Sequence, residues 1–254
     1  MDLKNIENKE HLKTKVAEML SEYNDLFIKL IDDPSEYKRG ALLYYWLRDY
    51  KNYIKSEADF SPNYYPSFKK GALVNVNLGF NIGSEMGGLH YALVIKDSNR
   101  KSPNLVIIPL TSLKPNKDIS RLRPTDLYLG EELYYKIQGK FEALKVSMPT
   151  EIELLRAAIK SHPDNAEAEH IKQKLNDLEK KIILLAKTKK KLSSLKHGSI
   201  CVLNQIRTIS KMRLIDPKDK YDVLYGLRLS NANLTKIENK IIELYANQEL
   251  DMRK

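Results

Sequence analysis

The feature that most constrains the fold is the spacing of apolar residues, which is helical at both ends of the sequence and alternating in the middle. Residues 3–32 carry one apolar stripe with a spacing of three to four, which predicts a helix ending before Pro34. A second helix is predicted over 34–57, since proline suits a first helical turn. This second helix is aromatic on nearly all sides, so we expect it to be buried on more than one side.

The alternating part begins after a linker at 59–67 that is rich in proline and polar residues. Half-buried strands alternate apolar and polar side chains, and their turns favour glycine. A loop with four glycines is predicted between the first two strands, at 79–88. The strands are predicted at 72–78, 91–95 and 105–110, with weaker candidates at 126–129 and 143–146. Short strands at this spacing favour a small antiparallel β-barrel.

Helical spacing returns after Pro149. We expect a helix over 151–160, a turn over 161–165 with Asp164 or Asn165 as N-cap, and a long helix over 166–195. Together these helices have the spacing of a helical hairpin or a short coiled coil. A strand at 199–203 and a closing helix over 218–246, broken near Ser230, complete an α+β chain.

The charge of the chain is +10 and is unevenly placed. Residues 1–68 hold 10 Lys or Arg and 12 Asp or Glu, so the basic surplus lies entirely after Phe68. A basic surplus suits a polyanion such as nucleic acid, but it also occurs in ordinary lysine-rich soluble proteins. The lysines at 187, 189, 190 and 191 have the same two readings, a solvated helix face or an RNA-backbone patch.

The composition limits which cellular compartments and which metal sites are expected for this chain. No apolar run approaches the roughly 20 residues of a membrane span, and the first residues do not resemble a secretory signal. Cys201 is the only cysteine, so neither an intrachain disulfide nor a cysteine-based metal site is expected, and the histidines have no metal-ligand spacing. A cytoplasmic protein without a cofactor fits these observations.

Two blocks of the sequence, in order, are similar to the MazF/PemK family of toxins. The first block has Lys70 and Gly71 before a strand, Gly83, Ser84 and Glu85 in the glycine-rich loop, Thr111 at the end of the third strand, and a further strand-like run at 124–129. The second is the segment 205–214, which begins Gln-Ile-Arg-Thr and precedes a helix. Each motif alone is common, whereas their occurrence together and in order is specific.

The resemblance implies an SH3-like antiparallel barrel with a C-terminal helix, as in MazF, PemK and CcdB. The barrel would comprise 69–149 and 197–254, with a helical hairpin inserted at 150–196 and a helical extension at 1–68. Such toxins cut single-stranded RNA at short sequences without a metal, form homodimers and are restrained by a cognate antitoxin protein. The aromatic helix 34–57 would then cover a groove of the barrel, mediate association or act as a built-in antitoxin-like segment; ordinary packing is the simpler alternative.

The resemblance also implies a catalytic site. Cleavage by the neighbouring 2′-hydroxyl needs a base, an acid and positive charge at the phosphate. Thr111 matches the family threonine, while His90 stands where the family has an arginine. Histidine exchanges protons near neutral pH but lacks a permanent charge, which Arg207 would provide if it faces the same cleft. A structural histidine at a strand start, and a structural ion pair at Arg207, are the alternatives.

Further residues are expected to bind substrate. Ser84 and Ser112 can donate to phosphate, Glu85 can act as a base or read a base edge, and Phe80 can stack on a base, as can Tyr91. Gln205 joins this set through the second block. Turn formation, solvation and core packing are the ordinary roles of the same residue types.

The sequence leaves two other classes of function open. One is a non-catalytic protein on the same barrel that grips RNA or inhibits a protein such as a topoisomerase, as the CcdB relatives do. The other is a scaffold whose helices carry the function.

Overall fold

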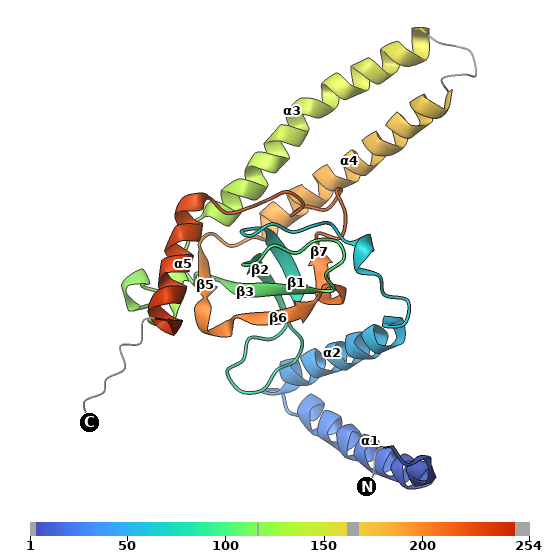
Figure 1. The fold of residues 1–254 in the computed structure, drawn as a ribbon, viewed down its shortest axis with the longest axis vertical. Coiled ribbons are helices and arrows are strands. Elements are labelled where there is room, and N and C mark those ends of the chain that lie inside the picture. Colours follow the sequence, from blue (N-terminus) through green and yellow to red (C-terminus); the bar gives the residue numbers. More distant parts are fainter. Residues whose placement is uncertain (1–3, 116, 162–167, 247–254) are drawn as a thin grey trace. The chain divides into compact units, whose positions relative to one another are not determined.

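The computed structural model describes residues 4–115, 117–161 and 168–246, and it has two compact units, Met1–Asp59 and Phe60–Lys254 (Figure 1). The expected turn at 161–165 and its N-cap lie largely outside the described residues. Short 3₁₀ helices occur at Ile6–Asn8, Pro62–Tyr64, Ile119–Arg121, Leu203–Gln205 and Lys211–Arg213.

The first unit is a pair of helices, α1 (Lys9–Asp32) and α2 (Tyr37–Ser56). They pack closely beside their connecting turn, where a Cβ on Gly40 would lie 3.1 Å from the Cβ of Leu30. Leu30, Gly40 and Leu43 are the buried residues of the two helices. The expectation that α2 is buried on more than one side is wrong, because Tyr44 and Tyr45 are 55% and 52% exposed. Farther from the turn, Trp46, Leu47 and Tyr53 of α2 are half-buried.

The second unit is built on an antiparallel sheet of seven strands, which confirms the α+β class. Their order is β4-β5-β3-β2-β1-β7. β6 lies off this path and pairs with the first half of β3, whereas β5 pairs with the second half of β3. The strands are β1 (Leu73–Asn77), β2 (Leu89–Val94), β3 (Asn104–Ser112), β4 (Asp126–Tyr128), β5 (Ser199–Val202), β6 (Arg207–Ser210) and β7 (Leu214–Asp216). Among the described residues β4 and β7 do not pair, so the sheet is not closed and the SH3-like barrel stays a prediction.

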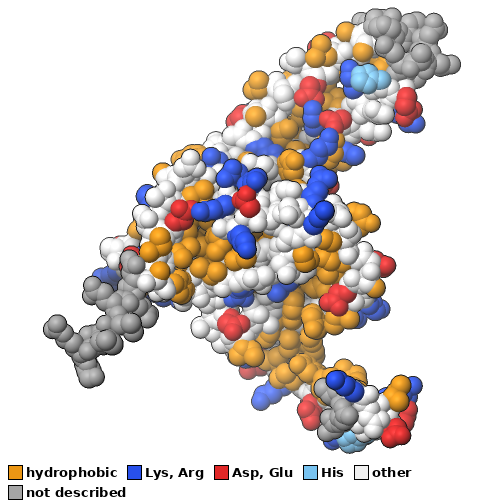
Figure 2. All heavy atoms as spheres, in the orientation of Figure 1, with side chains coloured by type: hydrophobic (Ala, Val, Ile, Leu, Met, Phe, Trp, Pro, Cys, Tyr) orange, Lys and Arg blue, Asp and Glu red, His pale blue; other side chains and the backbone are white. Residues whose placement is uncertain are grey.

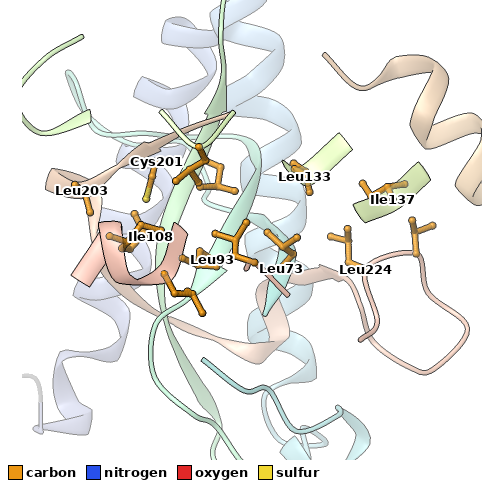
Figure 3. Close-up of a cluster of buried hydrophobic side chains, with 14 of the residues drawn as sticks. Leu73, Leu93, Ile108, Leu133, Ile137, Cys201, Leu203 and Leu224 are labelled. Atoms are coloured by element: carbon orange, nitrogen blue, oxygen red, sulfur yellow. The ribbon is translucent and has the colours of Figure 1, made fainter. Parts of the chain in front are cut away.

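Strand alternation produces two hydrophobic cores, one on each face of the sheet. Leu73, Leu93 and Ile108 belong to the larger core, which the helices following β4 and the segment before α5 complete (Figure 3). Val74, Ala92 and Ile107, each one residue away, belong to the second core with Leu105 and Ile209. Cys201 lies in the larger core, and burial, with a smaller effect of Asp126, raises the pKa of its thiol to about 12.

Three helices pack around the sheet: α3 (Glu132–Ser161), α4 (Ala168–Ser194) and α5 (Asn231–Tyr245). The prediction of a strand at 143–146 and of a helix beginning at 151 is wrong, because α3 begins at Glu132 and continues past Pro149. Leu133, Ile137 and Leu144 are spaced as one helical face and pack on the larger core, which favours the helix there.

The closing helix is also shorter than expected. The prediction of helix over 218–230 is wrong, since α5 begins after its N-cap Ser230, whose hydroxyl accepts a hydrogen bond from the Asn233 N–H. The preceding segment is held to the start of β1 by two backbone bonds, from the Leu73 N–H to the Leu227 carbonyl and from the Leu229 N–H to the Gly71 carbonyl. These contacts place Val223 and Leu224 in the core without a helix.

Lysines attach the base of the α3–α4 hairpin to β7 and to the segment that follows β7. The Lys191 ammonium lies 2.6 Å from the Asp216 carboxylate, and both side chains are mostly buried. Lys187 pairs with Asp222, while Lys140 donates to three backbone carbonyls between 222 and 225. Two of the four lysines of the predicted patch are therefore engaged in ion pairs that hold the hairpin in place.

Candidate functional site

A pocket of ≈ 310 Å³ lies where the start of β2, the end of β3 and the segment after α4 meet. This volume is near the lower end of the roughly 300–1,000 Å³ of small-ligand sites. Its lining contains His90 and Thr111, the two predicted catalytic residues from separate strands, together with Ser112. The remaining lining residues are Leu89, Tyr91, Leu110, Leu133, Ser194, Leu195, Lys196, Gly198 and Ser199.

The backbone fixes the proton position on His90. Its Nδ1 lies 3.1 Å from the Leu110 carbonyl oxygen, which can only accept a hydrogen bond. In the neutral ring Nδ1 therefore carries the hydrogen, and the lone pair is on Nε2. The half-buried ring lies on β2, next to Val76 of β1. A neutral imidazole held in this tautomer is suited to accept a proton at Nε2.

The hydroxyl groups of the pocket come from the last two residues of β3. Thr111 pairs with Ile200 and Ser112 with Ser199, so β5 fixes this end of the strand. Both side chains are half-buried. Next to them, burial and, to a smaller extent, Asp216 raise the pKa of Tyr91 to about 12, so this phenol stays protonated at neutral pH. The arrangement places a base and two hydroxyl donors around one cavity.

Arg207 does not line this pocket. It lies on β6 opposite Ile107, which is four residues before Thr111 along β3 and so roughly 13 Å away along the strand. Its guanidinium donates to the Met86 carbonyl at 3.3 Å and to the Gln205 Oε1 at 2.5 Å. The Gln205 Oε1 also accepts from the Met86 N–H at 3.1 Å. Arg207 and Gln205 thus hold the glycine-rich loop at Met86.

The other predicted substrate-binding residues lie in that loop. Ser84 and Glu85 are exposed at its tip and Phe80 is half-buried at its start, and none of the three lines the pocket with His90. Asn81 donates to the carbonyls of Leu78 and Met86, which closes the loop across its base. The structure therefore separates the predicted residues into a pocket group and a loop group.

Lys196 and Gly198 are pocket residues that the sequence reading did not single out. Gly198 has a φ of +79°, and a Cβ there would lie 3.0 Å from the Leu113 Cβ, so only glycine fits without strain. The histidine–glycine pair at 197–198 was visible as a helix end. Its position beside Thr111 depends on strand pairing and has no local signal in the sequence.

A second pocket, of ≈ 340 Å³, lies between α3 and α4. Lys181 in its lining is 2.6 Å from the Glu151 carboxylate and 3.3 Å from that of Asp177. These charges already neutralise one another, so the polar groups of this pocket are less available to a ligand than those around His90. We therefore place the candidate site at the sheet.

Over the residues described, no three His, Cys, Asp or Glu side chains form a group that could hold a metal ion. In the same part of the chain, the helices are all too short or too polar to cross a membrane.

Comparison with known proteins identifies a family over part of the chain. The family model of PemK-like, MazF-like toxins of type II toxin–antitoxin systems matches residues 69–154, which confirms the resemblance in this region. The matched segment contains β1 to β4, both predicted catalytic residues of the pocket and the first part of α3. The second block, 205–214, lies outside the matched range, and no curated protein matches the chain.

Proposed function

We propose that this protein is a toxin-type endoribonuclease that cuts single-stranded RNA in the pocket of His90 and Thr111. The observation that carries the proposal is the hydrogen bond from the His90 Nδ1 to the Leu110 carbonyl, within a segment that matches a toxin family. That bond leaves Nε2 as the base, in the same cavity as two hydroxyl groups. The family description adds a cognate antitoxin as a partner, and a homodimer remains part of the proposal.

The chemistry follows from the geometry. His90 Nε2 removes the proton of the RNA 2′-hydroxyl, and the 2′-oxygen then forms a bond to the adjacent phosphorus. The bond from phosphorus to the 5′-oxygen breaks, and that oxygen takes a proton from solvent. Solvent reaches the pocket on the side of Leu89 and Lys196, which are exposed lining residues. Thr111 and Ser112 donate to the phosphate oxygens as charge accumulates. The products are a 2′,3′-cyclic phosphate and a 5′-hydroxyl end, and no metal takes part.

The proposed scaffold is an SH3-like barrel formed by 69–149 and 197–254, with 150–196 inserted and 1–68 added. Support comes from β3, which pairs with β2 along one edge and with both β6 and β5 along the other. A strand that pairs with three others in this way is what a small barrel requires of a strand at its closure.

Cleavage of a long RNA in the presence of EDTA tests the proposal. We expect discrete cuts that end in 5′-hydroxyl groups. Replacing His90 with Ala should lower the rate by roughly 10²–10⁴-fold, which is typical for loss of a general base. Thr111→Ala should also lower it, through loss of a phosphate donor.

Ser120→Ala serves as the control, since Ser120 is an exposed hydroxyl residue in the 3₁₀ helix Ile119–Arg121, outside the pocket. Binding of RNA without cuts by the unmodified protein would contradict the nuclease and favour a non-catalytic binding protein. Cuts that survive in His90→Ala would contradict the assignment of the base.

A further inference from the structure

The candidate pocket needs a positive charge that neither predicted residue provides. The neutral His90 ring that acts as a base carries no charge, and Arg207 is engaged with Met86 and Gln205 outside the pocket. Cleavage passes through a phosphorane with more negative charge than the ground state, so a cation at the phosphate is required for efficient reaction. The source of this charge must be another side chain.

Lys196 is the one Lys or Arg among the described residues that line the pocket, and the same lining contains no carboxylate. Its side chain is exposed, and within the described part of the chain it makes no ion pair. Nearby lysines differ in this respect, because Lys187 and Lys191 are paired with Asp222 and Asp216. Lys196 therefore has an ammonium group available to an incoming phosphate.

The position of Lys196 is set by the core. The hairpin helix α4 ends at Ser194, and Leu192 and Leu195 on either side of that end pack against the larger core. The Leu113 N–H donates to the Gly198 carbonyl at 3.0 Å, which joins the following turn to the end of β3. The segment that carries Lys196 is thus held at both ends beside Thr111.

We propose that Lys196, supplied by the segment that follows α4 and lies outside the matched toxin region, binds the RNA phosphate in the pocket of His90 and Thr111. This inference rests on the proposed function and names the group that stabilises the phosphate in it. Lysine donates as a compact charge, which suits a phosphate reached from the rim of a pocket. Figure 2 shows Lys and Arg side chains, interspersed with Asp and Glu, along the α3–α4 hairpin and over the neighbouring surface.

Binding and cleavage by the full chain test this inference separately. The binding probe is a fluorescent single-stranded RNA with 2′-fluoro groups, which lacks the attacking hydroxyl and stays intact. Lys196→Ala should weaken binding about tenfold and make the plot of log affinity against log salt shallower by about 0.7, the value for one lost phosphate contact on a single strand. Lys196→Arg should retain both affinity and slope.

Lys101→Ala is the matched control, because Lys101 is an exposed lysine in the turn between β2 and β3 that does not line the pocket. It should keep the affinity and the cleavage rate of the unmodified protein, whereas Lys196→Ala should lose at least tenfold in cleavage. Equal losses in both variants would overturn the inference, as would Lys196→Ala cutting RNA at the unmodified rate.

The two proposals fail differently. If the unmodified protein binds the probe in a Lys196-dependent way but leaves natural RNA intact, the phosphate site stands and the nuclease does not. If it cuts RNA and Lys196→Ala cuts equally well, the nuclease stands and the Lys196 site does not. Absence of both binding and cutting overturns both. A thermal melt of each variant identifies any loss that comes from misfolding.

Discussion

The His90 imidazole replaces a backbone hydrogen bond at the point where two strands separate. Pairing of β2 with β3 ends at Ala92 and Pro109. The next carbonyl, of Leu110, instead accepts from the His90 Nδ1. The same contact satisfies a backbone acceptor and orients the base proposed for the pocket.

Arg207 has a positioning role that predicts a distinct result. Arg207→Ala removes the bonds that hold the Met86 carbonyl and the Gln205 side chain, each worth about 0.5–1.5 kcal/mol net. We expect the loop over 79–88 to loosen, with hydrogen exchange at the Met86 amide about tenfold faster. Exchange measured by mass spectrometry on a peptide covering the loop checks this, with Arg121→Ala as the control on an exposed arginine. An unchanged loop would contradict the positioning role.

Gly87 of the glycine-rich loop and Gly139 of α3 differ in the space that surrounds them, a difference that the sequence alone does not show. A Cβ on Gly87 would lie 2.7 Å from the Gly79 carbonyl oxygen, which is backbone and part of the bond that closes the loop. Gly139 lies within α3, and a Cβ there would have no atom within 4 Å. Gly87 is therefore required because a larger side chain has no room there, whereas Gly139 could be replaced by alanine without a clash.

Alanine at these two positions should therefore change stability in opposite directions. Gly139→Ala should raise the free energy of unfolding by roughly 0.5–1 kcal/mol, because alanine loses less backbone freedom in a helix. Gly87→Ala should lower it, since the loop backbone must shift. Thermal or urea unfolding of the two variants beside the unmodified protein measures both, and equal shifts would show that the loop is not closed as described.

The elements with the clearest patterns were those that could be predicted. β1, β2 and β3 alternate between two cores and lie within two residues of their predicted bounds, because each pattern reports burial on both faces. β6 and β7 were not predicted; β6 has a single apolar side chain, Ile209, so it shows no alternating pattern. The start of α3 was missed because its first apolar residues precede Pro149, which reads as a boundary.

The pocket was predictable only in part. The family resemblance predicted that His90 and Thr111 belong to one site, and both residues line the same pocket. Local sequence carries no sign that Lys196 lies beside them, since strand pairing between β3 and β5 creates that proximity. The engagement of Arg207 with Met86 depends on a contact across 121 residues of sequence and was likewise not predictable.

The two units differ in charge and in the kinds of surface that they expose. The basic surplus after Phe68, the two cores and the candidate pocket all belong to the second unit, whereas the first unit has exposed apolar side chains on both of its helices. The α3–α4 hairpin belongs to the second unit through its packing on the larger core and through Lys191 and Asp216. It is therefore part of the architecture that forms the pocket.

The most direct test of this account uses an RNA in which one nucleotide is altered. Once a cut site has been mapped, the nucleotide on its 5′ side is replaced by its 2′-deoxy form in an otherwise identical RNA. The account predicts that the full chain still binds this RNA and no longer cuts it at that position, because the attacking hydroxyl is missing. Continued cleavage at the altered nucleotide would contradict attack by the 2′-hydroxyl and, with it, the role of His90 as the base.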